Sequence, residues 1–237
     1  MSDTVIALDA LTKTYDGNAA LNQVTASAAS GQVIGLVGLN GAGKTTLLET
    51  ALGYTLPSSG SARIFGTESA DLGASPVGAR VGFVPQRDEL LSAYKGAEYL
   101  DLIANFYSTW HTDTIARLCI EWSIPVDRRI NKMSLGERQK LAIVSALGHH
   151  PELIVLDEPV ASLDPLARRQ FLQEIVAVAA DQNATVLFST HIVTDLERVA
   201  ERIWLLQQGR LVVDSPLDEL KEAHPNSLEE YFLEMHA

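Results

Sequence analysis

The sequence predicts an α/β fold in which one core is interrupted by a helical block. Three observations predict it. Short apolar strand patterns alternate with helical patterns along most of the 237 residues. A glycine-rich segment joins one such strand to one such helix. Between about Ser92 and Met133 strand patterns are absent and helical spacing takes over.

The first half of the chain supplies the opening strands and the glycine-rich turn. Alternating apolar residues predict a strand over residues 4–11, and a second strand is expected near Ala20–Ala28. The segment QVIGLVG (32–38) is apolar on both faces, which is typical of a strand buried within a sheet. The helix after the turn should end near Gly53, and Pro57–Gly60 should form a loop. Two short strands are then expected near Ser61–Phe65 and Val81–Val84.

The second half resumes the alternation after the helical block. Helical spacing over EYLDLIANFY (98–107) and TIARLCIEW (114–122) gives way to the buried strand PELIVLDEP (151–159). Asp164 as N-cap and Pro165 in the first turn predict the start of a helix. The remaining expected elements are a strand over residues 185–190, a hairpin over 202–215 and a helical tail.

We expect a single domain over residues 1–237, because no internal repeat or low-complexity segment divides the chain. Its core should comprise about residues 1–91 and 134–237, with the inserted helical subdomain at about residues 92–133. The single cysteine, Cys119, excludes an internal disulfide and is most simply a small buried hydrophobic residue.

Composition and charge narrow the class of protein. Hydrophobic residues make up 46% and charged residues 20% of the chain, which fits a soluble globular protein. The net charge of −12 argues against nucleic acid or an anionic lipid surface as the main partner. The apolar runs are too short to span a bilayer and no secretory leader opens the chain, so a cytosolic location is expected.

The glycine-rich segment matches the phosphate-loop pattern G-x-x-x-x-G-K-S/T between a strand and a helix. Its residues are Gly38, Leu39, Asn40, Gly41, Ala42, Gly43, Lys44 and Thr45. Backbone N–H groups at a helix N-terminus bind phosphate, and Lys44 should reach the β- and γ-phosphates of a nucleoside triphosphate. Thr45 can ligate Mg²⁺, and Thr46 can add a hydrogen bond. The alternative is a glycine-rich turn without a ligand.

An acidic pair, Asp157 and Glu158, follows the apolar residues of LIVLDEP. Ligands of open α/β sheets bind at the carboxyl ends of the strands, where this pair is expected to lie. Asp157 can hold Mg²⁺ directly or through water, and Glu158 can polarise an attacking water. The alternative is a strand-end pair that only caps the next loop.

With these motifs in place, the chain resembles the nucleotide-binding subunit of ATP-binding cassette (ABC) transporters, over nearly its whole length and with the motifs in the family's order. The resemblance implies a P-loop NTPase core with a mixed sheet, an antiparallel β subdomain and an inserted helical subdomain. It also implies ATP and Mg²⁺ as cofactors. The spacing from Gln86 to Ser134 fits the helical block of transporters and is too short for the coiled-coil insertion of chromosome-maintenance relatives.

Four further residues take roles from this resemblance. Tyr15 lies where the family has an aromatic that stacks on adenine, and Gln86 is similar to the Q-loop glutamine that contacts Mg²⁺ or its water. Asp164 resembles the D-loop aspartate of the dimer interface, and His191 the switch histidine that contacts the γ-phosphate. Each has a purely structural alternative: a surface tyrosine, a loop glutamine, a helix N-cap and a structural histidine.

The segment KMSLGERQKL is similar to the family signature Leu-Ser-Gly-Gly-Gln. Ser134 and Gly136 match, whereas Leu135 replaces the first glycine and Glu137 replaces the glutamine. In the family this helix N-terminus binds the γ-phosphate of ATP held by the other subunit, and Glu137 should weaken that binding slightly. Local physics alone predicts only a capping box between Ser134 and Glu137.

The resemblance therefore implies an ATPase that dimerises around two Mg·ATP, as a homodimer or a paralogous heterodimer, and drives a separate transmembrane permease. Contact with the membrane's inner face would occur only through that permease. FYSTW (106–110) and EEYFLEM (229–235) are similar to single-cassette subunits of bacterial exporters and favour export. Two alternatives stay open: a soluble ABC ATPase acting on ribosomes or DNA, and a degenerate module that binds ATP without hydrolysing it.

Overall fold

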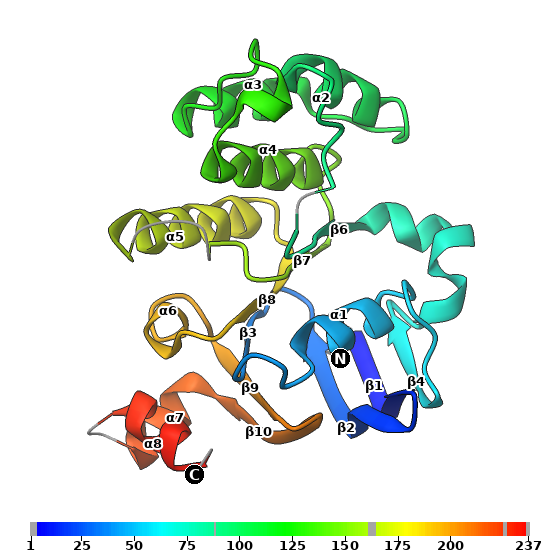
Figure 1. Cartoon of the computed structure of the whole chain (residues 1–237), viewed down its shortest axis with the longest axis vertical. Coiled ribbons are helices and arrows are strands. Elements are labelled where there is room, and N and C mark those ends of the chain that lie inside the picture. Colours follow the sequence, from blue (N-terminus) through cyan, green and yellow to red (C-terminus); the bar gives the residue numbers. More distant parts are fainter. Residues whose placement is uncertain (1–3, 88, 161–164, 225–226, 236–237) are drawn as a thin grey trace.

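The structure, a computed structural model, describes residues 4–87, 89–160, 165–224 and 227–235 (Figure 1). Its strands form two sheets. The larger sheet has the spatial order β10 (Arg210–Pro216), β9 (Arg202–Gln207), β3 (Val33–Val37), β8 (Thr185–Thr190), β7 (Leu153–Leu156) and β6 (Val81–Val84). The smaller sheet has the order β2 (Asn18–Ala29), β1 (Thr4–Tyr15), β4 (Ser59–Ile64) and β5 (Thr67–Glu68).

The larger sheet is mixed. Strands β6, β7, β8, β3 and β9 pair in parallel, and β10 pairs antiparallel with β9. Every residue of β3, β7 and β8 is buried, which explains why these strands are continuous apolar runs. Because parallel strands end at the same edge, the segments that follow β3, β6, β7 and β8 meet there.

The smaller sheet is antiparallel throughout and packs across α1 (Lys44–Ala51) from the larger one. One hydrophobic cluster joins Leu11 of β1, Leu36 of β3 and Leu48 of α1, all with no exposed surface. The helix that carries the end of the glycine-rich segment is thereby fixed between the two sheets. The α/β fold with a mixed sheet, a separate antiparallel sheet and helices is confirmed.

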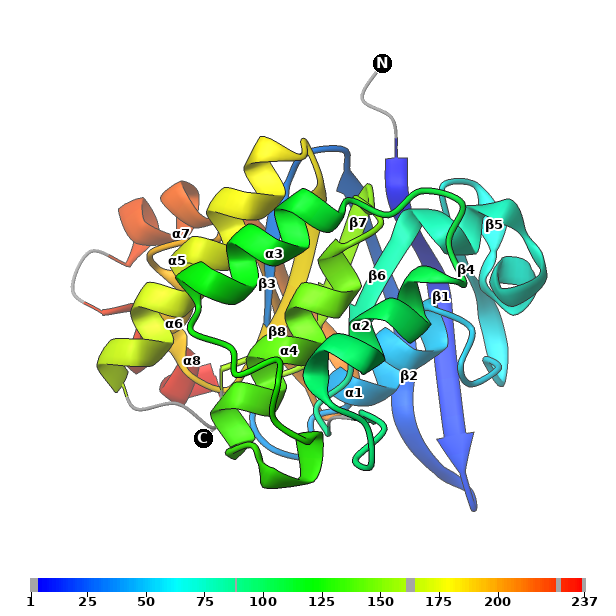
Figure 2. The same ribbon diagram turned by 90° about the horizontal axis from the view of Figure 1, so that it is seen from above.

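The remaining helices lie on the other side of the larger sheet from α1 (Figures 1 and 2). They are α2 (Gly96–Ala104), α3 (Thr112–Glu121), α4 (Leu135–Leu147), α5 (Pro165–Asp181), α6 (Val193–Leu196), α7 (Leu217–Ala223) and α8 (Leu228–Met235). Short 3₁₀ turns lie at Ser69–Ala74, Pro76–Arg80 and Ile130–Lys132. None of the helices in the described ranges is both long and apolar enough to cross a membrane.

The helical block lies at one end of the molecule, where α2 and α3 pack on the outer side of α4 (Figure 1). Trp122 ties this block to α5, since its ring meets Phe171 edge-on with centroids 4.5 Å apart. Cys119 is buried here as expected, and desolvation raises the pKa of its thiol to about 11. The division into a core of residues 1–91 and 134–237 and a subdomain of 92–133 stays a prediction.

Two local expectations were incomplete. Ser59 and Gly60 belong to β4 rather than to a loop, because β1 runs on to Tyr15 and offers Thr12 as the partner of Ser59. The 3₁₀ turns before β6 were not predicted. Their glycine- and serine-containing sequence resembles an irregular loop, and it is tertiary packing of Leu72 that orders it.

Candidate functional site

The glycine-rich segment has a backbone that requires its glycines. Gly41 and Gly43 adopt φ of 83° and 106°, the left-handed region that disfavours residues with side chains. A Cβ on Gly38 would lie 2.3 Å from the carbonyl oxygen of Leu206, and one on Gly43 would lie 2.5 Å from that of Ala20. The loop is therefore shaped by its own glycines and by the close approach of β9 and β2.

A backbone hydrogen bond from outside the motif also holds this loop. The amide of Gly209, in the turn between β9 and β10, donates to the carbonyl of Ala42 at 2.9 Å. The carbonyl of Gly209 accepts from the amide of Asn22 on β2 at 2.8 Å. The sequence signalled a glycine turn here but not its contact with the phosphate loop, because that contact joins segments far apart in the chain.

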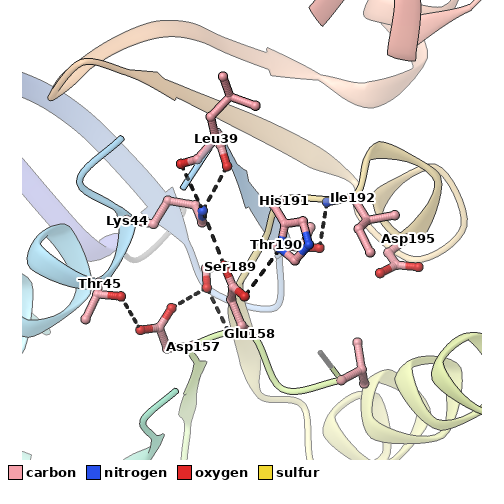
Figure 3. Close-up of polar contacts among 12 residues, drawn as sticks. Leu39, Lys44, Thr45, Asp157, Glu158, Ser189, Thr190, His191, Ile192 and Asp195 are labelled. Carbon is pink, nitrogen blue, oxygen red and sulfur yellow. Dashed lines mark hydrogen bonds and ion pairs between the residues drawn. The ribbon is translucent and has the colours of Figure 1, made fainter. Parts of the chain in front are cut away.

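Lys44 lies inside the loop rather than in solvent (Figure 3). Its ammonium donates to the carbonyl of Gly38 at 2.8 Å and to that of Leu39 at 3.3 Å. It also lies 3.4 Å from Oε1 of Glu158, and the residue is only 5% exposed. The loop thus holds one buried positive charge at the N-terminus of α1, where phosphate binds favourably.

Asp157 is buried at the end of β7 and is 1% exposed. The hydroxyl of Thr45 donates to Asp157 Oδ2 at 2.6 Å, and the hydroxyl of Ser189 donates to Oδ1. Among the described residues no cation pairs with this carboxylate, although a buried charge needs compensation. A hydroxyl and a carboxylate are oxygen ligands of the kind Mg²⁺ prefers, so Thr45 and Asp157 fit a magnesium site.

Glu158 bridges the lysine and the predicted switch histidine (Figure 3). Its Oε1 faces Lys44, and its Oε2 lies 3.3 Å from Nδ1 of His191. Glu158 adopts a left-handed φ of 48°, a conformation that costs about 1–3 kcal/mol in a non-glycine residue. Its amide donates to Ser189 Oγ at 2.8 Å, and this bond helps to hold it.

His191 follows β8 at the same sheet edge and has a side chain that is 38% exposed. The chain turns there because the amide of Ile192 donates to the Thr190 hydroxyl at 3.0 Å, after which α6 begins. The structure therefore brings together Lys44, Glu158 and His191 from three separate segments, as the sequence predicted.

Ser189 was missed by sequence reasoning. Its hydroxyl contacts both acidic residues, donating to Asp157 and accepting from the amide of Glu158. Its position could have identified it, because Ser189 lies two residues before His191 on β8 and beside the end of β7. A serine there looked like one more strand residue, because only the parallel pairing of β7 with β8 brings its hydroxyl to the acidic pair.

Other predicted site residues have no described hydrogen bond to Lys44, Asp157 or Glu158. Gln86 is exposed just after β6, and the described hydrogen bonds join it to neither Thr45 nor Asp157. Asn40 is exposed at the loop tip, and Thr46 is half-buried in the first turn of α1. Tyr15, 45% exposed at the end of β1, carries the Lys13 ammonium 4.9 Å from its ring centroid, and Asp164 lies outside the described residues.

The signature segment forms a second cluster, at the N-terminus of α4. Ser134 is the N-cap, its hydroxyl accepts from the amide of Glu137 at 3.2 Å, and Gly136 lies in the first turn. Glu137 Oε2 accepts from the amide of Ser134 at 2.6 Å, so the predicted capping box is present. Within the described part of the chain, no contact joins this cluster to the phosphate loop.

Glu137 has a partner that the sequence did not reveal. Nη1 of Arg128 lies 3.1 Å from Oε1 and 3.2 Å from Oε2 of Glu137. The pKa of the Glu137 carboxyl is lowered, first by the hydrogen bond from the Ser134 amide and further by Arg128. The negative charge expected at the signature is therefore largely offset within the same chain.

Comparisons with known proteins agree with this geometry. The family model described as ABC transporter matches residues 21–161. The bacitracin transport ATP-binding protein BcrA of Bacillus licheniformis is 29% identical over 95% of this chain and 74% of its own. The Nod factor export ATP-binding protein I of Mesorhizobium japonicum is 30% identical over 94% of this chain and 67% of its own.

Solved structures share the fold over 90% or more of this chain. A structure described as the ATP-binding subunit of an ABC transporter superposes with a TM-score of 0.86 at 27% identity, covering 99% of this chain and 100% of that one. A dimeric ATP-binding cassette bound to ADP and Pi has a TM-score of 0.80 at 24% identity, covering 90% and 98%. The chain therefore belongs to the ABC transporter family, as an ATP-binding and ATP-hydrolysing subunit.

Proposed function

We propose that this chain hydrolyses Mg·ATP to power a separate transmembrane permease that exports its substrate. The observation that carries the hydrolytic part is the Glu158 carboxylate, which bridges Lys44 and His191 beside the buried Asp157. The direction rests on relatives whose names state bacitracin transport and Nod factor export. Membrane contact would then occur through the permease, at the inner face.

Each residue at the sheet edge has a distinct role in this proposal. Lys44 exchanges its carbonyl partners for the β- and γ-phosphates, with the loop amides around them. Thr45 and Asp157 hold the Mg²⁺, and Gln86 approaches it when the β6 loop moves inward. Bound there, the metal offsets the negative charge of the phosphates. Tyr15 stacks on the base, a contact that tolerates different bases.

The Lys44–Glu158 pair gives ATP binding a chemical consequence. When phosphate takes Lys44, Oε1 of Glu158 loses its cation and becomes free to accept a proton from water. Oε2 keeps its contact with His191, which orients the carboxylate and reaches toward the γ-phosphate. General-base assistance of this kind is worth roughly 10²–10⁴ in rate.

The second half of the ATP site comes from another subunit in this proposal. The amides of Leu135 and Gly136 have no described hydrogen-bond partner, and the Ser134 hydroxyl keeps its proton free because its oxygen accepts from the amide of Glu137. Ser134 and Gly136 can therefore bind a γ-phosphate held on a second copy or a paralogue. Asp164, expected at this interface, lies outside the described residues.

The permease has a groove to dock in. A cavity of about 560 Å³ lies between the segment after α1, the 3₁₀ turns, β6 and the segment after α2. Its aromatic wall includes Tyr54 and Phe106, which are 69% and 75% exposed. Exposed apolar surface of this kind is typical of protein–protein contacts. Because β6 also leads to Gln86, docking here can be coupled to the ATP site.

Hydrolysis by the purified chain, alone and with the membrane protein that co-purifies with it, tests this proposal. We expect ATP hydrolysis that the permease stimulates and that Glu158→Gln abolishes. A folded wild type with no hydrolysis in either preparation would favour a module that only binds ATP. Recovery of ribosomes or DNA in place of a membrane protein would favour a soluble ABC ATPase.

A further inference from the structure

Glu137 places a carboxylate at the helix end that is proposed to receive a phosphate. One of its oxygens accepts from the Ser134 amide at 2.6 Å, so the side chain is folded back onto the α4 N-terminus. The Glu137 carboxylate and a phosphate bound at the same helix end would repel each other. The partial positive charge of the helix N-terminus is too small to offset both anions. An unpaired Glu137 would therefore oppose phosphate binding at Ser134 and Gly136.

Arg128 supplies the positive charge that this helix end lacks. Its Nη1 lies within 3.2 Å of both Glu137 oxygens, while the side chain stays 49% exposed. The described contacts of its guanidinium engage Nη1, which leaves other N–H groups of the fork facing solvent. The pair is thus nearly neutral, and it adjoins the signature cluster through the bond of Glu137 to the Ser134 amide.

The backbone of Arg128 fixes this arrangement. Its amide donates to the carbonyl of Pro125 at 2.8 Å, and its carbonyl accepts from the amide of Gly96, the first residue of α2, at 3.2 Å. The neighbouring residues Lys95 and Arg129 form a β-bridge between the same two segments. The Arg128 backbone is therefore tied to the start of α2, and its side chain reaches the start of α4 through Glu137.

We propose that Arg128 is a positioning residue of the ATP half-site at Ser134, where it neutralises Glu137 so that the α4 N-terminus accepts the γ-phosphate of the opposite subunit. This inference rests on the proposed function, in which Ser134 and Gly136 bind that phosphate. It predicts that Arg128 favours ATP-driven dimerisation by offsetting the charge of Glu137. Removing Arg128 should therefore have little effect on dimerisation once residue 137 carries no charge.

A double-mutant cycle on ATP-driven dimerisation tests the inference. The parent is Glu158→Gln, in which slow hydrolysis should preserve the ATP-bound dimer, and the readout is the ATP concentration at half-dimerisation by sedimentation. Arg128→Ala should raise that concentration about three- to ten-fold, the scale of one lost charge contact. Adding Glu137→Gln should bring it back to within about two-fold of Glu137→Gln alone, because coupled residues are not additive.

Two variants control for other effects. Arg128→Lys keeps the charge and should recover most of the affinity that Arg128→Ala loses. Arg117→Ala removes an arginine of similar exposure, paired with Glu121 at 3.0 Å on α3, and should leave dimerisation unchanged. The melting temperature without nucleotide should be alike for all these variants, because exposed pairs contribute little to stability.

The outcomes separate this inference from the proposed function. If Arg128→Ala behaves like Arg117→Ala, or if its defect persists with Glu137→Gln, the inference is wrong. Ser134→Arg should prevent dimerisation by blocking the half-site itself. If Ser134→Arg dimerises normally, or if the parent stays monomeric at saturating ATP, the proposed half-site is wrong and the inference fails with it.

Discussion

The two halves of the proposed ATP site are built in opposite ways. The half at the phosphate loop is buried and joined by many contacts: Lys44 and Asp157 are 5% and 1% exposed and lie in one network with Glu158. The half at the signature is an exposed capping box beside the Arg128–Glu137 pair. The phosphate-loop half can be preorganised by the core of its own chain. The signature half has to meet a nucleotide held by a partner, so its groups must stay open to solvent.

The largest expected effect is at the centre of the buried half. Lys44→Ala removes the ammonium that is proposed to bind the phosphates and leaves Glu158 without its cation. We expect ATP affinity to fall more than about 100-fold, since charge-assisted contacts in a buried site are the strong ones. Calorimetric titration with ATP measures this. Lys221→Ala, at an exposed lysine of α7 that donates to the carbonyl of Glu197, is the matched control and should bind normally.

Glu158→Gln should separate binding from chemistry. The amide keeps the size of the side chain but cannot act as a general base, so hydrolysis should fall by roughly 10²–10⁴. ATP binding should be retained or strengthened, because Lys44 is no longer held by a carboxylate. Parallel measurements of turnover and ATP affinity check both parts, and equal losses in the two would show that Glu158 acts only on binding.

Ser189→Ala should loosen the buried half without removing a proposed ligand. It deletes the hydrogen bonds to Asp157 and to the Glu158 amide, so the free energy of unfolding should fall by about 1–3 kcal/mol. Turnover should drop about ten-fold, because the Asp157 carboxylate and the backbone of Glu158 both lose support. Ser145→Ala is the matched control, since that buried hydroxyl bonds only within α4, to the carbonyl of Ala142. Similar turnover in the two variants would contradict the role of Ser189.

The smallest effect is expected at the signature. Glu137→Gln should change the ATP concentration at half-dimerisation by less than about three-fold, because Arg128 already offsets the charge.

The same residue should make folding stability depend on pH. The folded-state pKa of Glu137 is depressed, so its contribution to the free energy of unfolding is present above its ordinary pKa, about 4.3. That contribution is lost as the pH falls through the lowered value, where wild type and variant should unfold alike. Unfolding measured across acid pH checks this, and a difference that persists at the lowest pH would contradict it.

The sequence predicted the buried half well because its residues follow strong local patterns. The spacing of Gly38, Gly43 and Lys44 specifies the loop, and Asp157 and His191 each follow an apolar run that can only be a buried strand. Contacts between side chains that are distant in the sequence leave no such local pattern and could not be predicted. Ser189 reaches Asp157 only through the β7–β8 pairing, and Arg128 meets Glu137 only after the intervening turn has folded.

In the signature half, one sequence pattern predicts both a helix cap and the proposed phosphate site. The Ser134–Glu137 capping box was predictable from the sequence, and it is present. It does not by itself reveal a ligand site, because the same geometry caps an ordinary helix. Leu135 is 52% exposed beside the box, and Leu39 is 51% exposed at the tip of the phosphate loop, so both lie open to a second chain.

These two exposed leucines allow the most direct measurement of the central claim, that each ATP lies between two chains. One Glu158→Gln chain would carry Leu39→Cys and another Leu135→Cys, joined by a short bifunctional thiol reagent. We expect cross-linking between the two chains that depends on ATP, with none when Phe106→Cys in the proposed docking groove replaces Leu135→Cys. Equal cross-linking with and without ATP, or none at saturating ATP, would contradict it.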